Sequence, residues 1–154
     1  MHKTVGEFMT STVTSLTSAA RLLDAALLVR RSGKRRVPVV DEKGKVVGIV
    51  SDRDVARFAP SILGHSTPDE YNKIFEVTAI TAVMTKDPFT VTPESKITEA
   101  VAFFYEKKIG ALPVVRNGEL AGILTVTDML GLLYSVLMEK ESGGGFAEAS
   151  GFEG

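Results

Sequence analysis

Two copies of a Ser/Thr-x-x-Asp motif are the residues of this sequence best suited to chemistry. Ser51 is followed by Asp54, and Thr125 by Asp128, each where an apolar strand gives way to a helix. The motif predicts a capping box, in which the hydroxyl accepts from a helical N–H and the carboxylate reaches back. A carboxylate also accepts hydrogen bonds from a vicinal diol, and a helix N-terminus attracts phosphate. Capping and ligand binding can coexist, so both interpretations stay open.

The densest basic run of the chain comprises Arg30, Arg31, Lys34, Arg35 and Arg36. Cations at a helix C-terminus offset the helix dipole and stay solvated, and we assign this role to Arg30 and Arg31. Arg35 and Arg36 directly precede a strand, where ligand binding is the alternative. A nucleic-acid patch is a third interpretation. The net charge of -1 and the lack of interleaved aromatic residues disfavour it.

Several classes of active site and metal site lack their residues in this sequence. The absence of cysteine excludes disulfides, thiolate nucleophiles and sulfur-ligated zinc. The two histidines, His2 and His65, stand in no catalytic motif, and the acidic residues do not cluster as metal ligands. A set of nucleophile, base and orienting group is missing, as is a Walker-type phosphate loop. We therefore expect no enzyme, no metal and no covalent cofactor.

The composition is that of a globular protein with one domain or two small ones that share a core. Hydrophobic residues make up 44% of the 154 residues, and charged residues make up 24%. No stretch approaches the roughly 20 apolar residues that a membrane span needs. The first residues lack the apolar core of a secretory signal. We expect a cytoplasmic protein that has no membrane partner.

An internal repeat organises the chain, with matching motifs in the same order at a spacing of about 75 residues. The one difference in spacing falls in the turn between two strands, where a deletion leaves the register intact. The matching pairs are Met9-Thr10 with Met84-Thr85, Val37-Pro38-Val39-Val40 with Leu112-Pro113-Val114-Val115, Gly48-Ile49-Val50-Ser51 with Gly122-Ile123-Leu124-Thr125, and Asp54 with Asp128.

Each repeat predicts the order strand, helix, strand, strand, helix. Apolar residues at helical spacing predict the first helices, and Thr17 and Thr92 are the expected N-caps, the latter followed by Pro93 at the first helical position. β-branched runs around glycine-containing turns predict two hairpins. These hairpins are 37–40 with 46–50 and 112–115 with 120–124.

The predicted division of the chain follows from the repeat. Residues 59–80 contain Pro60, Gly64 and Pro68 and predict a linker with a short helix from Asp69 to about Phe75. A long apolar helix is expected after Asp128, and the glycine-rich end of the chain predicts a disordered tail. The four parts are repeat 1 at 1–58, the linker at 59–80, repeat 2 at 81–141 and the tail at 142–154.

The duplicated motifs resemble a tandem pair of cystathionine β-synthase (CBS) domains, also called a Bateman module. The resemblance covers residues 5 to about 138 and is specific because every motif occurs twice in the same order. It implies an α/β fold of two β-α-β-β-α repeats related by a pseudo-twofold axis, with two clefts between the repeats. It also implies a regulatory ligand that contains adenosine, such as AMP, ADP, ATP or S-adenosylmethionine.

The resemblance further implies which residues line the two clefts. In the family the aspartates hold the ribose hydroxyls, and basic residues before the strand contact phosphates. Gly110 and Ala111 stand where the first repeat has the Arg35-Arg36 pair, which leaves room for a flat base and predicts that the clefts differ. One cleft should combine Ser51, Arg53 and Asp54 with 85–89 and with Gly110, Ala111 and Leu112, and the other should combine Thr125, Thr127 and Asp128 with 10–14, Arg35 and Arg36.

The function implied by the resemblance is that of a regulatory module, an energy or metabolite sensor. The alternative is a ligand-free structural module for dimerisation or protein interaction. A homodimer fits both hypotheses, because the helices near 18–31, 94–107 or 128–138 carry more apolar surface than one sheet face can cover. An unknown protein target is the other expected partner, whereas nucleic acid is not expected.

Overall fold

Two β-hairpins form where the sequence predicts them. In the computed structural model, which describes residues 3–59 and 67–143, β2 (Arg36–Val40) pairs antiparallel with β3 (Val46–Ser51). β5 (Ala111–Arg116) pairs antiparallel with β6 (Glu119–Thr125). The β-branched side chains of these runs suit a pleated, half-buried surface, and the turns supply the reversal. Both predicted hairpins are confirmed.

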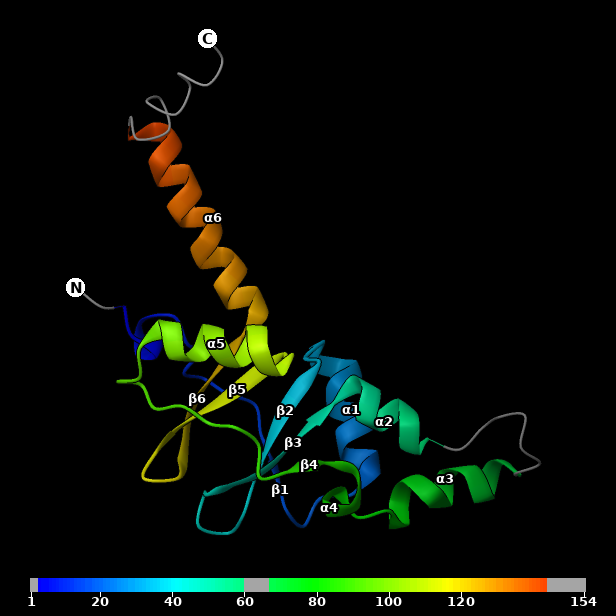
Figure 1. Cartoon of the computed structure of the whole chain (residues 1–154). Coiled ribbons are helices and arrows are strands. Elements are labelled where there is room, and N and C mark those ends of the chain that lie inside the picture. The colour runs from blue at the N-terminus through cyan, green and yellow to red at the C-terminus, as the bar shows by residue number, and fades with distance from the viewer. Residues whose placement is uncertain (1–2, 60–66, 144–154) are drawn as a thin grey trace.

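The remaining elements complete a mixed α/β fold of two similar halves, which lie side by side in Figure 1. The predicted fold class is therefore confirmed. The first half contains β1 (Leu16–Thr17), α1 (Leu22–Ser32) and α2 (Asp52–Phe58). Between the hairpins come α3 (Pro68–Val77), α4 (Ile80–Val83) and β4 (Thr85–Lys86). The second half has α5 (Ile97–Lys107) and α6 (Val126–Ser142), and a short 3-10 helix η1 (Val5–Glu7) begins the fold.

The two halves exchange their leading segments. The first sheet has the strand order β1-β2-β3-β4, so it includes β4 from the second sequence repeat. In return, Thr10 of the first repeat bridges Ile123 of β6, with N–H to O distances of 2.9 and 3.0 Å between the backbone N and O atoms. The sequence repeats and the packing units therefore do not coincide.

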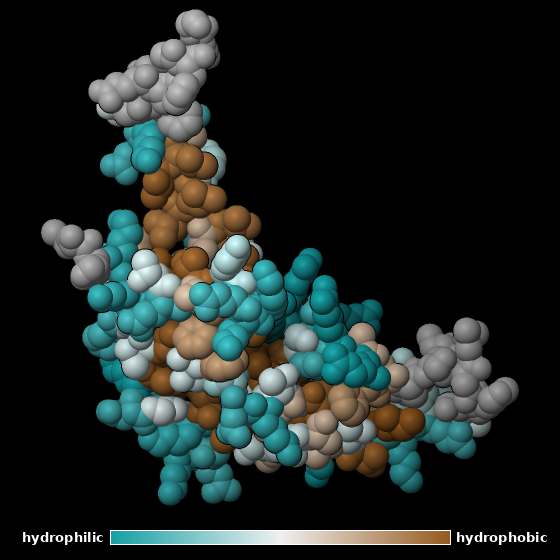
Figure 2. Space-filling view, viewed as in Figure 1, coloured by the Kyte–Doolittle hydropathy of each residue, from teal (hydrophilic) through white to brown (hydrophobic). Residues whose placement is uncertain are grey.

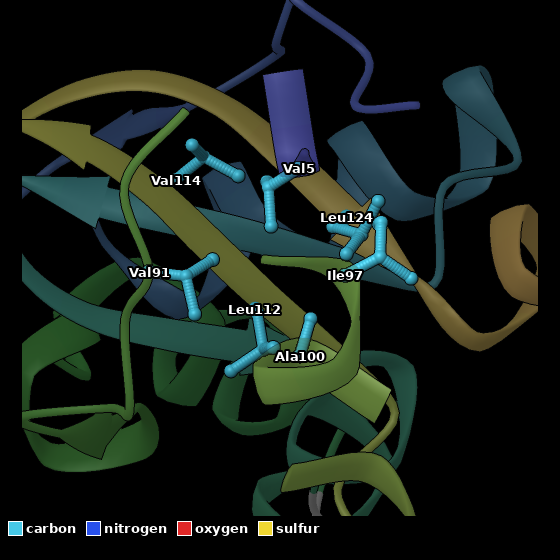
Figure 3. Close-up of a cluster of buried hydrophobic side chains, with 7 residues drawn as sticks. All are labelled: Val5, Val91, Ile97, Ala100, Leu112, Val114 and Leu124. Carbon is cyan, nitrogen blue, oxygen red and sulfur yellow. The ribbon is translucent and has the colours of Figure 1, made fainter. Parts of the chain in front are cut away.

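The buried cores follow the same exchange. Val5 in η1 is 0% exposed and lies within the core of the second half, beside Leu112 and Leu124 (Figure 3). Ile80 and Val83 of α4 lie in the core of the first half. Each half is thus closed by a short helix that belongs to the other repeat, because neither β-hairpin with its helix buries its apolar face alone.

The exchange explains why the repeated Met-Thr and Gly-Ile motifs occur together. Met84 packs over Gly48 of β3, where a Cβ atom would lie 2.3 Å from its Sδ. Met9 packs over Gly122 of β6, where a Cβ atom would lie 2.7 Å from its Sδ. A Cβ atom would also lie 3.0 Å from Thr85 O at Gly48 and 2.9 Å from Thr10 O at Gly122, so the close approach of the exchanged segments favours glycine at both positions.

The predicted starts of two helices are wrong by several residues. Thr92 and Ser95 form a turn, with a 3.1 Å bond from Ser95 N–H to Thr92 O, and α5 begins only at Ile97. Thr17 likewise lies in β1, and α1 begins at Leu22. The incoming η1 segment hydrogen-bonds the backbone of residues 93–97, and Leu22 N–H donates to Thr78 O at 2.8 Å. These tertiary partners override the local helix-start signals.

Hydrogen bonds stabilise the η1 segment, both locally and against the residues that precede α5. The backbone N–H of Thr4 donates to the Glu7 carboxylate at 2.6 Å, which lowers the pKa of Glu7. Val5 N–H donates to Ser95 O at 2.9 Å, and Gly6 N–H donates to Pro93 O at 2.8 Å. The segment therefore docks through both its backbone and the Val5 side chain.

The expected linker helix is present as α3, two residues longer at its end than predicted. The predicted long helix after Asp128 is α6, which Figure 1 shows projecting away from the two sheets. Of the predicted tail, Ser142 is the last helical residue, and 144–154 lie outside the described residues. Within the described part of the chain, no helix is long and apolar enough to cross a bilayer.

Candidate ligand-binding clefts

The Ser/Thr-x-x-Asp motifs cap the helices that follow the two hairpins. Ser51 Oγ accepts from Asp54 N–H at 3.0 Å, and Asp54 Oδ2 accepts from Ser51 N–H at 2.9 Å. Thr125 Oγ1 accepts from Asp128 N–H at 3.3 Å, and Asp128 Oδ2 accepts from Thr125 N–H at 2.8 Å. The predicted capping boxes are confirmed. In both motifs Oδ2 makes the cap, which leaves Oδ1 for other partners.

The residues before each hairpin are fixed against the first turn of its helix. Asp52 N–H donates to Arg35 O at 2.8 Å, and Val126 N–H donates to Gly110 O at 3.2 Å. These bonds place the Arg35-Arg36 and Gly110-Ala111 pairs beside the helix N-termini. In the first turn of α6, Thr127 N–H has no hydrogen-bond partner among the described residues.

The first cleft is a cavity of about 520 Å³ at the N-terminus of α6. Thr125, Thr127 and Asp128 line it, together with the basic residues Lys34, Arg35 and Arg36. Of the predicted members, the structure brings together Arg35, Arg36, Thr125, Thr127, Asp128 and four residues of the segment 10–14, namely Thr10, Thr12, Val13 and Thr14.

The second cleft is a cavity of about 400 Å³ beside β3 and β5. All five residues of the segment 85–89 line it, together with Ser51, Gly110 and Ala111 from the predicted set. The apolar part of its lining comes from Ile49, Pro88, Phe89 and Ile109. Its size suits a small ligand, as does that of the first cleft.

Three predicted site residues lie elsewhere. Leu112 is 0% exposed and belongs to the core of the second half, because alternate residues of β5 face opposite sides of the sheet. Arg53 is exposed on α2 and is not among the residues that line either cleft. Asp54 is 8% exposed, and its Oδ1 lies 3.8 Å from Nη1 of Arg57. Its observed role is that of a helix cap.

The two clefts differ in charge. The first is lined by the cations Lys34, Arg35 and Arg36 and by the single carboxylate of Asp128. The second has Arg36 and Lys86 against Asp87. Within the part of the chain that the structure describes, none of these side chains makes an ion pair with another residue. The first cleft is therefore the better site for an anion.

Sequence reasoning missed the contribution of Gly33 and Lys34 to the first cleft. Gly33 ends α1 in the left-handed conformation, with φ of 68°, which turns the chain toward the cleft. Lys34 was part of the basic run but had no assigned role. The signal that could have found it is the glycine, because a helix that ends there leaves the next residues in a loop that leads to β2.

Comparisons with known proteins agree with the duplicated motifs. A sequence model described as the CBS domain matches residues 5–61 and 79–135. A CBS domain-containing protein of Dictyostelium discoideum is 33% identical over 118 residues, which cover 75% of this chain and 81% of that protein. An uncharacterized protein of Methanocaldococcus jannaschii is 36% identical over 110 residues, but the match covers only 24% of its length.

Solved structures share the arrangement of both halves. The CBS-pair protein CBSX2 from Arabidopsis thaliana superposes with a TM-score of 0.72 at 28% identity, covering 90% of this chain and 99% of that one. CBSX2 has also been crystallised in complex with AMP, and that structure matches with a TM-score of 0.71 at 27% identity over 86% of this chain and 97% of that one.

Proposed function

The chain belongs to the CBS domain family, with two domains in tandem, and we propose that it is a regulatory module that binds an adenosine-containing ligand. The observation that carries the proposal is the lining of the first cleft. It combines three basic residues with one carboxylate at the N-terminus of α6. The complex of CBSX2 with AMP supports this choice of ligand class.

The chemistry of the first cleft matches the parts of a nucleotide. Asp128 keeps Oδ1 outside the cap and is the acceptor for the ribose hydroxyls. Lys34, Arg35 and Arg36 supply the cations for phosphate, and the N–H of Thr127 adds a donor at the positive end of the α6 dipole. A phosphorylated ligand such as AMP, ADP or ATP therefore fits this cleft better than S-adenosylmethionine, which carries a sulfonium cation.

Ligand binding would make the module a sensor of energy state or of a metabolite. The cleft joins residues 10–14 and Arg35-Arg36 of the first repeat to Thr125–Asp128 of the second. A ligand that contacts both repeats favours one relative arrangement of the two halves, because it shifts the population toward the state that it binds better. That shift is the signal for a protein target.

Substitution of Arg35 and Arg36 tests the phosphate contacts. The double variant Arg35→Ala, Arg36→Ala should weaken AMP binding at least tenfold, since a hydrogen bond to a charged group contributes about 1.5–3 kcal/mol. Adenosine binding should not weaken, because adenosine has no phosphate for these side chains to contact. Isothermal titration calorimetry with each ligand measures both affinities.

A matched control comes from the same basic run. Arg30→Ala, Arg31→Ala removes the same charge at the end of α1, where neither residue lines the two clefts. This variant should bind AMP as the unaltered chain does, apart from a small long-range effect. If both double variants lose AMP affinity equally, or if neither does, the assignment of the phosphate contacts is wrong.

A structural dimerisation module is the second candidate function, and α6 is the observation that favours it. Leu130, Leu133, Tyr134, Leu137 and Met138 are exposed and follow helical spacing along one face. Figure 2 shows apolar side chains covering the projecting helix. We propose that a second copy of the chain covers this stripe, defined by these five residues, so that the module is a homodimer. Dimerisation and ligand binding are compatible.

A further inference from the structure

Arg36 and Gly110 belong to the walls of both clefts. The guanidinium of Arg36 lies directly against the backbone of Gly110, where a Cβ atom would be 2.4 Å from Cζ and from Nη2. Only a glycine leaves room for the guanidinium in this position. The contact therefore lies at the boundary between the two cavities, and one side chain serves both.

The backbone of Arg36 is held in β2, but its side-chain charge has no ion-pair partner among the described residues. Arg36 begins β2 opposite Ser51, and Pro38, two residues along on the same face, is fully buried. The Arg36 side chain is only half-buried and makes no ion pair within the described residues. A long side chain on a fixed backbone can move its guanidinium by changing rotamers.

The two clefts surround the Arg36 guanidinium with different charged residues. Beside Arg36, the first cleft holds Lys34 and Arg35, and an anion there would attract all three cations. Beside Arg36, the second cleft holds one cation and one anion, Lys86 and Asp87, which offset each other. If Arg36 turns toward the first cleft, the second becomes neutral overall, with apolar walls and a free glycine surface.

We propose that Arg36 gives the two clefts different ligand preferences, and that it couples ligand binding in one cleft to ligand binding in the other. A phosphorylated ligand in the first cleft draws the guanidinium off Gly110. The exposed Gly110 surface then accepts the flat base of an uncharged adenosine-type ligand in the second cleft. This inference rests on the proposed function of the first cleft. Because coupling is reciprocal, an uncharged ligand in the second cleft also strengthens phosphate binding in the first.

A reporter in the second cleft separates the two sites. The chain has no tryptophan, so Phe89→Trp places one emitter on the wall of the second cleft, where Phe89 is 48% exposed. Adenosine is titrated with and without saturating ribose 5-phosphate, which carries the diol and the phosphate but no base. Sodium chloride equalises the ionic strength. The Kd of adenosine from tryptophan emission should fall about fivefold or more with ribose 5-phosphate present.

Two variants in the reporter background identify the coupling residue. With Arg36→Ala, adenosine should bind tightly without ribose 5-phosphate, and adding ribose 5-phosphate should change its Kd less than twofold. With Arg35→Ala, which touches only the first cleft, more ribose 5-phosphate should be needed, but the coupling at saturation should remain. Equal coupling in the Phe89→Trp reporter chain and in the same chain with Arg36→Ala would overturn the proposal.

The remaining outcomes separate this inference from the proposed function. If calorimetry detects adenosine or AMP but ribose 5-phosphate leaves the Kd at the second cleft unchanged or raises it, the coupling is wrong while the proposed function stands. Adenosine that binds without changing the emission of residue 89 would also overturn the assignment of the second cleft. If no adenosine compound binds at all, the proposed function itself fails.

Discussion

Asp54 and Asp128 hold the same position in their repeats and make the same cap, yet among the described residues only Asp128 lines a cleft. The sequence predicts the cap because its partners lie three residues away in the chain. It cannot predict the exposure of the second carboxylate oxygen, because that depends on the elements packed around each helix start. The two aspartates therefore share a motif and a capping role, but they differ in their access to a cleft.

Substitution of each aspartate separates capping from binding. Asp128→Ala should weaken AMP binding in the first cleft by about 1.5–3 kcal/mol, because an acceptor for the ribose is lost. Asp54→Ala should leave that affinity nearly unchanged, although both variants should lose about 1 kcal/mol of stability with the cap. Calorimetry gives the affinities and urea unfolding gives the stabilities. Equal losses of AMP affinity in both variants would contradict the assignment.

At the scale of elements, the hairpins could be predicted and the helix starts could not. Residues 37–40 and 46–50 are paired by a short turn, so local sequence determines their structure. Thr92-Pro93 carries a strong helix-start signal, but Gly6 N–H bonds Pro93 O and Val5 N–H bonds Ser95 O. Those partners lie about 90 residues away in sequence, and no local pattern reveals them. Gly33 marks the end of α1 in the sequence, but which cavity the following residues line depends on the elements packed around them, so Gly33 and Lys34 were not predicted as cleft walls.

Because η1 packs into the core of the second half, we expect the stability of the fold to be sensitive to substitutions in η1. Val5→Ala should cost about 2 kcal/mol of stability, because it removes fully buried methyl groups from the core of the second half. Val77→Ala is the matched control, since Val77 is 58% exposed and should change stability by at most about 0.5 kcal/mol. Thermal and urea unfolding measure both. Equal effects would show that η1 does not close the second core.

At the scale of the whole molecule, the repeat predicted two similar halves, and the resemblance to CBS pairs implied two clefts. Neither revealed how the exchanged segments join the halves. Turn contacts also link the hairpins, with Val46 N–H donating to Gly118 O at 3.1 Å and Leu120 N–H donating to Gly44 O at 3.2 Å. Together with the exchanged segments, these bonds make each half depend on the other. A ligand bound between the halves therefore acts on an already joined unit.

The apolar stripe of α6 predicts the oligomeric state. Leu130→Glu with Leu137→Glu should convert a dimer to a monomer, because two charges would be buried in the interface. Ser135→Glu adds a charge to the same helix outside the stripe and should leave the dimer intact. Sedimentation at micromolar concentration distinguishes these results. A monomeric unaltered chain would contradict the dimer at once.

Titration of AMP into the unaltered chain tests whether the module binds adenine nucleotides. We expect saturable binding with micromolar affinity, about -8 kcal/mol, and weaker binding of CMP or GMP at equal concentration. At 100 times the Kd, AMP should stabilise the fold by about 2.7 kcal/mol and raise the Tm by about 5–10 °C. Neither heat nor a Tm shift with AMP, ADP, ATP, adenosine or S-adenosylmethionine would contradict the proposed function.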